Sequence, residues 1–114
     1  PTLPVSAVAR DAAHVAASAL AHWQLGQPSA VLAVQPCPAA FAMPREAMDR
    51  AVHAAEREAE AMGIQGPAIT PFMLGRLAGL TDGKSLQANV ALLLHNAGTA
   101  ARIAQGLLDL EAPA

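Results

Sequence analysis

The stretch GIQGPAITPFMLGRLAGLTDGKSLQANVALLLHNAGTAARIA, residues 63–104, carries most of the information about the fold. Thr70 is a favoured N-cap residue and is followed by a proline, a common first helical residue, so we expect a short helix over about 70–80. A turn containing Asp-Gly follows, and Ser85 then predicts the start of a long helix that ends near residue 110. Two consecutive helices are therefore expected here.

The long helix and the segment upstream of it both show helical periodicity. Apolar residues at three- and four-residue steps predict that the long helix turns one face inward. That face comprises Leu86, Val90, Leu93, Leu94, Ala97, Ala101, Ala104 and Leu108. Upstream, Pro44 and Gly63 predict the two ends of another helix. Its inward residues are expected to be Met48, Val52, Ala55, Ala59 and Met62.

The N-terminal third of the chain mixes a helical pattern with a candidate strand. Residues 11–25 are rich in helix formers and are followed by Gly26, which is a favoured residue after a helix. The short apolar run at 30–34 predicts a buried strand, of the kind that parallel sheets contain. Only residues 3–8 offer a second strand. We therefore expect a helix-rich α/β fold, with about four helices around one or two short strands whose sheet partners are missing.

Composition limits both the size of the core and the class of partner. The chain has 114 residues, a net charge of −2 and 3% aromatic residues, which allows one domain at most with a small, alanine-rich core. The charges are scattered and form no basic stripe, which argues against nucleic-acid binding. No apolar run is long enough to cross a membrane. The single cysteine, Cys37, fits a reducing cytoplasm and is interpreted as a small buried thiol.

Two dense motifs in the second half of the chain resemble a known family. Residues 63–72 (GIQGPAITPF) and 81–97 (TDGKSLQANVALLLHNA) are similar to GI-x-GK-x-x-TPFLL and TGG-x-SL-x-ANIALV-x-NNA, the signature of pseudouridine-5′-phosphate glycosidases. Upstream, HWQLG at 22–26, the apolar run and QPCP at 35–38 follow the family order W-x-LG, strand, NPIP. The resemblance extends from about Val8 to Leu108, and the chain is identified as a C-terminal segment, 1–114, of such an enzyme.

The resemblance implies a fold, an activity and a cofactor. Members of this family are much longer, have an α/β/α fold, associate into homotrimers and are cytoplasmic. They cleave the C–C glycosidic bond of pseudouridine 5′-phosphate to uracil and ribose 5-phosphate, and use a divalent metal, typically Mn²⁺. A lysine attacks the sugar carbon as the ring opens, an acidic residue moves protons and a carboxylate lies near the metal. The resemblance places these groups in the N-terminal part of the family, so the chain alone is expected to be inactive and to bind no metal.

Asn89 is the residue that the resemblance assigns to substrate binding, because it matches the asparagine of SL-x-ANIAL. On the long helix Asn89 and Asn96 border the apolar face, where a carboxamide could bind a uracil edge or orient a lysine adduct. The alternative is that the Asn89 amide caps a neighbouring loop. Lys84 is the only lysine, and we do not interpret it as the nucleophile.

The chain departs from the family pattern at three positions: Gln35, Pro67 and His95 replace an asparagine, a lysine and another asparagine. A second hypothesis is therefore a standalone helical interaction module without catalysis, or a vestigial one. A metal site was also considered at Asp49, His53 and Glu56, which share one helix face and could ligate a metal. Charged neighbours on that face favour a solvated surface instead.

Overall fold

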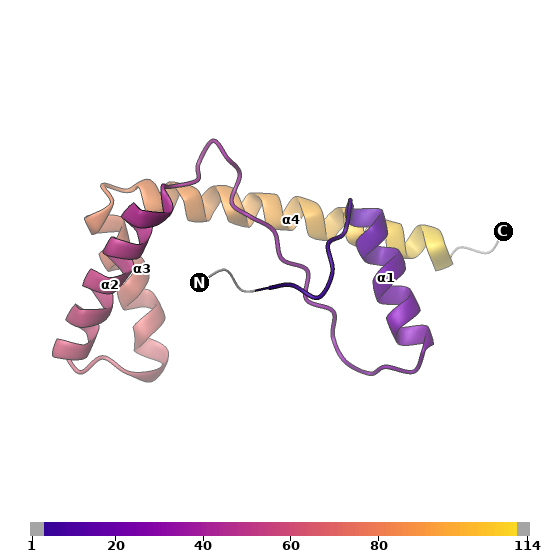
Figure 1. Cartoon of the computed structure of the whole chain (residues 1–114), viewed down its shortest axis with the longest axis horizontal. Helices are drawn as coiled ribbons and strands as arrows, with labels where there is room; N and C mark the ends of the chain where they lie inside the picture. Colours follow the sequence, from indigo (N-terminus) through magenta and orange to yellow (C-terminus); the bar gives the residue numbers. More distant parts are fainter. Residues whose placement is uncertain (1–3, 112–114) are drawn as a thin grey trace. The chain divides into compact units, whose positions relative to one another are not determined.

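The computed structural model describes residues 4–111 and is helical through most of that range (Figure 1). Along the chain the elements are α1 (Ala12–Gln24), α2 (Arg45–Ala61), the 3₁₀ helix η1 (Gly66–Ala68), α3 (Ile69–Leu80) and α4 (Lys84–Glu111). The chain divides into two compact units, one formed by residues 1–35 and 95–114 and the other by residues 36–94. No helix among residues 4–111 combines the length and the apolar character that crossing a bilayer requires.

Helix α1 begins and ends where the local sequence predicts. Its N-cap is Asp11, whose carboxylate accepts a hydrogen bond from the His14 backbone N–H at 2.8 Å. After the helix, Gly26 adopts a φ of +77°, which glycine tolerates and most other residues do not. The Gln27 N–H then donates to the carbonyl of His22 at 3.3 Å, so the chain closes the helix with a Schellman motif.

In the unit that contains α1, the buried residues are small and permit close packing. Ala16 and Ala19 are buried. A Cβ atom placed on Gly106 of α4 would lie 3.0 Å from the Ala16 Cβ and 3.6 Å from the Ala13 Cα. The two helix backbones therefore approach each other through a methyl group on one side and a glycine on the other.

The structure does not confirm the one or two short strands expected from the sequence. Residues 30–34 are extended without strand pairing, and no strand is present among residues 4–111. Leu32 is 85% exposed, although a buried strand was expected there. For the other candidate, 3–8, Leu3 lies outside the described residues and the remainder is irregular. A strand exists only through hydrogen bonds to a neighbour, and the described residues offer none.

Helix α2 confirms the helix expected between Pro44 and Gly63. Pro44 is the N-cap residue rather than the first helical residue, and Gly63 follows the helix with a φ of +66°. The Ile64 N–H donates to the Ala59 carbonyl at 2.9 Å and completes a second Schellman motif. The inward face of α2 is formed by Ala51, Ala55 and Ala59, which are buried, whereas Met62 is 68% exposed.

The assignment of Met62 to the inward face was therefore wrong, and Ala51 was missed. Met62 is the C-cap residue, where the chain leaves the helix, so the helical period no longer determines its direction. Helix α2 packs against α3, and Figure 1 shows the two lying side by side. Alanines at four-residue steps on α2 allow this contact to be close.

The start of α3 differs from the expectation that Thr70 is its N-cap. Helix α3 begins at Ile69, directly after η1, so Thr70 lies inside the first turn and makes no capping hydrogen bond. The difference has a local cause. Pro67 has its φ restricted near helical values and starts the 3₁₀ turn early, and the α-helix continues from that turn.

Thr81 joins the end of α3 to the start of α4, a role that the sequence analysis gave to Ser85. The Thr81 hydroxyl donates to the Leu77 carbonyl at 2.7 Å and accepts from the Ser85 backbone N–H at 3.0 Å. Thr81 is buried, and the turn that follows places Asp82 at a φ of +51°. Helix α4 accordingly starts at Lys84, and the side chain that satisfies its first turn comes from the preceding helix end.

The face that α4 was expected to turn inward is exposed. Every predicted inward residue of α4 is exposed, and Leu94 reaches 71%. The half-buried residues instead lie around the helix on the other side and include Ala88, Leu92, Thr99, Ile103 and Gly106. An apolar stripe indicates a face that avoids water, and the residues at 4–111 do not cover this one.

Candidate functional site

Asn89 lies in the second turn of α4 and is half-buried. Its helical position is between the half-buried side of α4, marked by Leu92, and the exposed apolar side, marked by Leu93. The amide therefore stands at a boundary where one side is covered and the other is open to a partner or a ligand.

The loop that follows residue 35 contacts α4 immediately before Asn89. The thiol of Cys37 donates a weak hydrogen bond to the carbonyl of Ala88, with 3.7 Å between Sγ and the oxygen. Cys37 is half-buried rather than fully buried, and it is a free cysteine. On the other side of the loop, the Phe41 N–H donates to the Pro38 carbonyl at 2.9 Å. Cys37 and the two prolines around it thus hold a compact loop against the turn that carries Asn89.

Gln35 makes the most extensive polar contact between distant parts of the sequence. Its Nε2 donates to Oδ1 of Asn96 at 2.6 Å, and its Oε1 accepts from the Thr99 hydroxyl at 3.0 Å. The Thr99 hydroxyl in turn accepts from Nη2 of Arg102 at 3.0 Å. Sequence reasoning noted Gln35 only as a departure from the family pattern. Asn96, Thr99 and Arg102 are spaced three residues apart on one helix, but this spacing does not identify Gln35 as their partner.

A bidentate ion pair joins α2 to α3. The Arg76 guanidinium donates to both carboxylate oxygens of Glu58, through Nε and, at 2.8 Å, through Nη2. The hydrogen bond from Arg76 lowers the pKa of Glu58 below its ordinary value of 4.5, and burial opposes this shift only in part. The same bond raises the pKa of Arg76. This pair stabilises the packing of the two helices, and sequence reasoning did not identify it.

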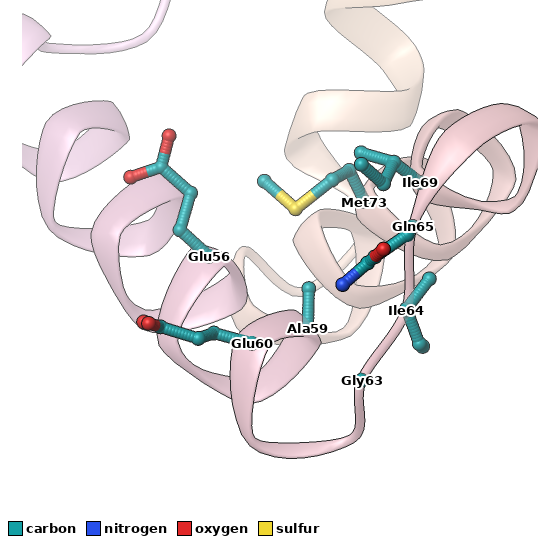
Figure 2. Close-up of a pocket in the computed structure, with 8 residues that line it drawn as sticks. All are labelled: Glu56, Ala59, Glu60, Gly63, Ile64, Gln65, Ile69 and Met73. Atoms are coloured by element: carbon teal, nitrogen blue, oxygen red, sulfur yellow. The ribbon is translucent and has the colours of Figure 1, made fainter.

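A shallow depression of about 540 Å³ lies between the end of α2 and the start of α3 (Figure 2). Its apolar side is formed by Ile64, Ile69 and Met73, while Glu56 and Glu60 extend from α2 on the opposite side. Part of the first family motif, GIQ at 63–65, forms the turn at its edge. Asn89 does not line this depression, so the candidate substrate residue and the depression are separate features.

The described residues do not form a metal site. Within 4–111, no three His, Cys, Asp or Glu side chains come together in a way that could hold an ion. Asp49 pairs with Arg45 at 3.6 Å, and His53 contacts Glu56 at 3.2 Å on a strongly exposed face. These contacts agree with the interpretation of this face as a solvated, charged surface. Asp49, His53 and Glu56 are therefore not brought together as a set of metal ligands.

The helix-rich arrangement and the two sequence motifs together indicate one family of proteins. The chain belongs to the family described as indigoidine synthase A like protein, whose model matches residues 2–106. The resemblance to pseudouridine-5′-phosphate glycosidases is confirmed by curated relatives of that name. The relative from Paracoccus denitrificans is 47% identical over 97 residues, which is 85% of this chain and 32% of the relative. The relative from Escherichia coli is 39% identical over 95 residues, or 83% and 30%.

A solved structure supports the same fold. The crystal structure of the prealnumycin C-glycosynthase AlnA in complex with ribulose 5-phosphate matches with a TM-score of 0.76 and 28% identity. The match covers 90% of this chain and 34% of the C-glycosynthase. The chain thus spans about a third of the length of the relatives that it matches, and it shares with them a helix-rich part of a larger architecture.

Proposed function

We propose that this chain is part of a pseudouridine-5′-phosphate glycosidase and supplies a helical layer and one substrate-binding residue, Asn89. The identity of 47% over 97 residues to a glycosidase of that name is the observation that carries this proposal. The whole enzyme would add water across the C–C glycosidic bond of pseudouridine 5′-phosphate and release uracil and ribose 5-phosphate. The C-glycosynthase that matches in fold also holds a phosphorylated pentose, ribulose 5-phosphate, in its crystal structure.

Asn89 is suited to bind a nucleobase. Its carboxamide carries two N–H donors and one carbonyl acceptor, which complement the alternating acceptors and donors on a uracil edge. Asn89 is half-buried, so water would compete less for these hydrogen bonds than at an exposed position. The adjacent Cys37 loop would limit the movement of the helical turn that presents the amide. We expect Asn89 to bind the base and not to take part in bond cleavage.

The catalytic groups are assigned to the rest of the enzyme. The only lysine of the chain, Lys84, is exposed at the first residue of α4, and the resemblance gives this position no catalytic role. The nucleophilic lysine, the acidic residues and the ligands of a divalent cation such as Mn²⁺ would therefore lie outside this chain. A cytoplasmic location and a homotrimer complete the proposal on the basis of the resemblance.

The same proposal explains the unpaired apolar segment at 30–34. Val31, Leu32 and Val34 are exposed, and the segment is extended. In the whole enzyme we expect this segment to pair with a sheet formed by the remaining residues, which would satisfy its backbone groups and bury its side chains. The exposed apolar side of α4 would be covered by the same body.

The alternative function is a helical module that binds a partner or a second copy without catalysis. The observation that favours it is the exposed apolar row on α4 within residues 36–94, namely Leu86, Val90, Leu93 and Leu94. The two functions differ in what the isolated chain should do. A module should be monomeric or of fixed stoichiometry and unfold cooperatively by itself, whereas a part of a glycosidase should need the remaining residues for stability.

The test of the proposed function is uracil release by the complete enzyme that contains this chain. Unsubstituted enzyme should release uracil from pseudouridine 5′-phosphate, and Asn89→Ala should raise KM at least tenfold because the base loses its hydrogen-bond partner. Gln87→Ala is the matched control, since Gln87 is an exposed amide two residues away on the same helix. Absence of uracil release by the unsubstituted enzyme would refute the activity. Equal kinetics for the two variants would remove Asn89 from the site.

A further inference from the structure

Thr81 forms a polar link between the end of α3 and the start of α4. Its hydroxyl donates to the Leu77 carbonyl at 2.7 Å and accepts from the Ser85 backbone N–H at 3.0 Å. The hydroxyl thus acts as a donor towards α3 and as an acceptor towards α4. The residue is only 8% exposed, so water competes little for these two hydrogen bonds. A single oxygen atom therefore joins the two helices.

The backbone around Thr81 restricts the same connection. The Thr81 N–H donates to the Leu77 carbonyl at 3.0 Å, and the Gly83 N–H donates to the Ala78 carbonyl at 2.8 Å. The Lys84 N–H then donates to the Thr81 carbonyl at 3.1 Å. Gly83 adopts a φ of +75°, which allows the chain to turn sharply between these hydrogen bonds. The turn therefore leaves α4 little freedom to tilt or slide against the end of α3.

Asn89 lies one helical turn beyond the Ser85 N–H that Thr81 accepts, which is roughly 6 Å along the axis of α4. A helix is stiff over one turn, so the position of Ser85 determines where the Asn89 amide is presented. The weak hydrogen bond from the Cys37 thiol to the Ala88 carbonyl, at 3.7 Å, restricts rotation of α4 at the same turn. All of these residues belong to one compact unit, residues 36–94.

We propose that Thr81 is a positioning residue for the base-binding amide, because its hydroxyl sets the placement of the turn of α4 that carries Asn89. This proposal rests on the proposed function and adds to it a residue that acts without touching the substrate. Loss of the hydroxyl should allow the first turns of α4 to move relative to α3, so that the Asn89 amide meets the base less accurately. The kinetic effect should therefore resemble that of losing Asn89, a higher KM, and should be smaller.

Variants of the complete enzyme test this role through the hydroxyl. Thr81→Val keeps the side-chain shape, removes both hydrogen bonds and should raise KM about three- to fivefold, within the range for one hydrogen bond of ordinary strength. Thr81→Ser keeps the hydroxyl and should stay within about twofold of the unsubstituted enzyme. Ala55→Gly is the control for lost stability, because it weakens α2 at a buried position and leaves the hydrogen bonds of Thr81 in place. Its KM should be unchanged at temperatures well below unfolding.

The double variant Thr81→Val/Asn89→Ala separates positioning from a general structural role. Once the Asn89 amide is absent its placement no longer matters, so the double variant should have the same KM as Asn89→Ala alone. Two independent effects would instead multiply in KM. Multiplied effects, an unchanged KM in Thr81→Val, or an equal rise in KM in Ala55→Gly would each overturn the proposal.

Hydrogen–deuterium exchange tests the placement of α4 independently of turnover. Backbone amides at 86–92 should exchange faster in Thr81→Val and at the unsubstituted rate in Thr81→Ser. If the unsubstituted enzyme releases no uracil, the proposed function fails, and exchange at 86–92 alone decides whether Thr81 fixes this turn. Equal exchange in Thr81→Val and in the unsubstituted enzyme would overturn the positioning role whatever the kinetics.

Discussion

The contact between α1 and α4 at Gly106 can be tested by comparing two glycines of the same helix. Gly98 and Gly106 both lie inside α4 and in the same compact unit, but their surroundings differ. A Cβ at Gly98 would approach only Nη1 of Arg102, at 3.6 Å, which is an ordinary contact with a flexible side chain. A Cβ at Gly106 would lie 3.0 Å from the Cβ of Ala16, which is buried.

The expected energies follow from these distances. Replacing a glycine in a helix interior by alanine stabilises the helix by about 0.5–1 kcal/mol. Two carbons at 3.0 Å, with an optimal separation of about 3.8 Å, repel by about nine well depths, or roughly 1–2 kcal/mol. Gly98→Ala should therefore stabilise the chain by about 0.5–1 kcal/mol. Gly106→Ala should be less stable than Gly98→Ala by roughly 1–2 kcal/mol.

Urea unfolding followed by far-UV circular dichroism measures this difference. At an m value of about 1 kcal/mol/M, the midpoints of the two variants should differ by about 1 M or more, with Gly98→Ala the higher. The double variant should show additive effects, because the two sites share no contact. A Gly106→Ala variant that is as stable as Gly98→Ala would refute the close approach of α1 to α4.

Two further predictions concern the unit formed by residues 36–94. Because Arg76 lowers the pKa of Glu58, the ion pair should stabilise the chain above Glu58's ordinary value of 4.5 and lose this contribution as the pH falls through the lowered folded-state pKa. Arg76→Gln should therefore lower Tm at pH 7 but not at pH values at which Glu58 is protonated in both states, and an equal loss at both pH values would contradict the assignment. Thr81→Val keeps the side-chain shape but leaves the Ser85 N–H without its acceptor, so it should destabilise the chain by about 1–2 kcal/mol in a urea titration. Thr70→Val is its control, since Thr70 makes no capping hydrogen bond, and equal effects of the two substitutions would contradict the role of Thr81.

The ends of the helices could be predicted from the sequence because local residues determine them. Gly26 and Gly63 follow α1 and α2 with positive φ, at the positions where the sequence predicted the ends of these helices. Asp11, which was counted within the first helix, is its N-cap. Each of these features depends on four to six neighbouring residues, and glycine or a capping side chain is nearly sufficient for it. Local prediction failed where proline began a 3₁₀ turn ahead of Thr70. It also failed at Pro44, which is an N-cap residue, and at Ser85, where Thr81 supplies the cap.

The inward faces could be predicted only in part. On α2 the helical period identified Ala55 and Ala59, which are buried against a neighbour within the chain. On α4 the same reasoning selected residues that are exposed, such as Leu94. The periodicity of apolar residues indicates which side of a helix avoids water. It does not indicate whether the residues that cover this side belong to the same chain. The strand at 30–34 was not confirmed for the same reason, since pairing requires residues from elsewhere.

The residues of the candidate site could also be predicted only in part. Asn89 was identified through a family motif, and the structure places it half-buried on α4. The contacts of Gln35 with Asn96 and Thr99 could not be predicted, because they join residues more than sixty positions apart. No periodicity or local propensity contains information on such a pairing.

The buried apolar residues of the described chain are all alanines: Ala16, Ala19, Ala51, Ala55 and Ala59. A methyl group removes little hydrocarbon from water, and the heat-capacity change of unfolding scales with the hydrocarbon that becomes hydrated. The free energy of unfolding of the chain should therefore change only gently with temperature, without the pronounced maximum that a core of leucines and phenylalanines produces. Such a chain melts gradually, and a sharp thermal transition becomes possible only when larger side chains, such as those now exposed on α4, are covered.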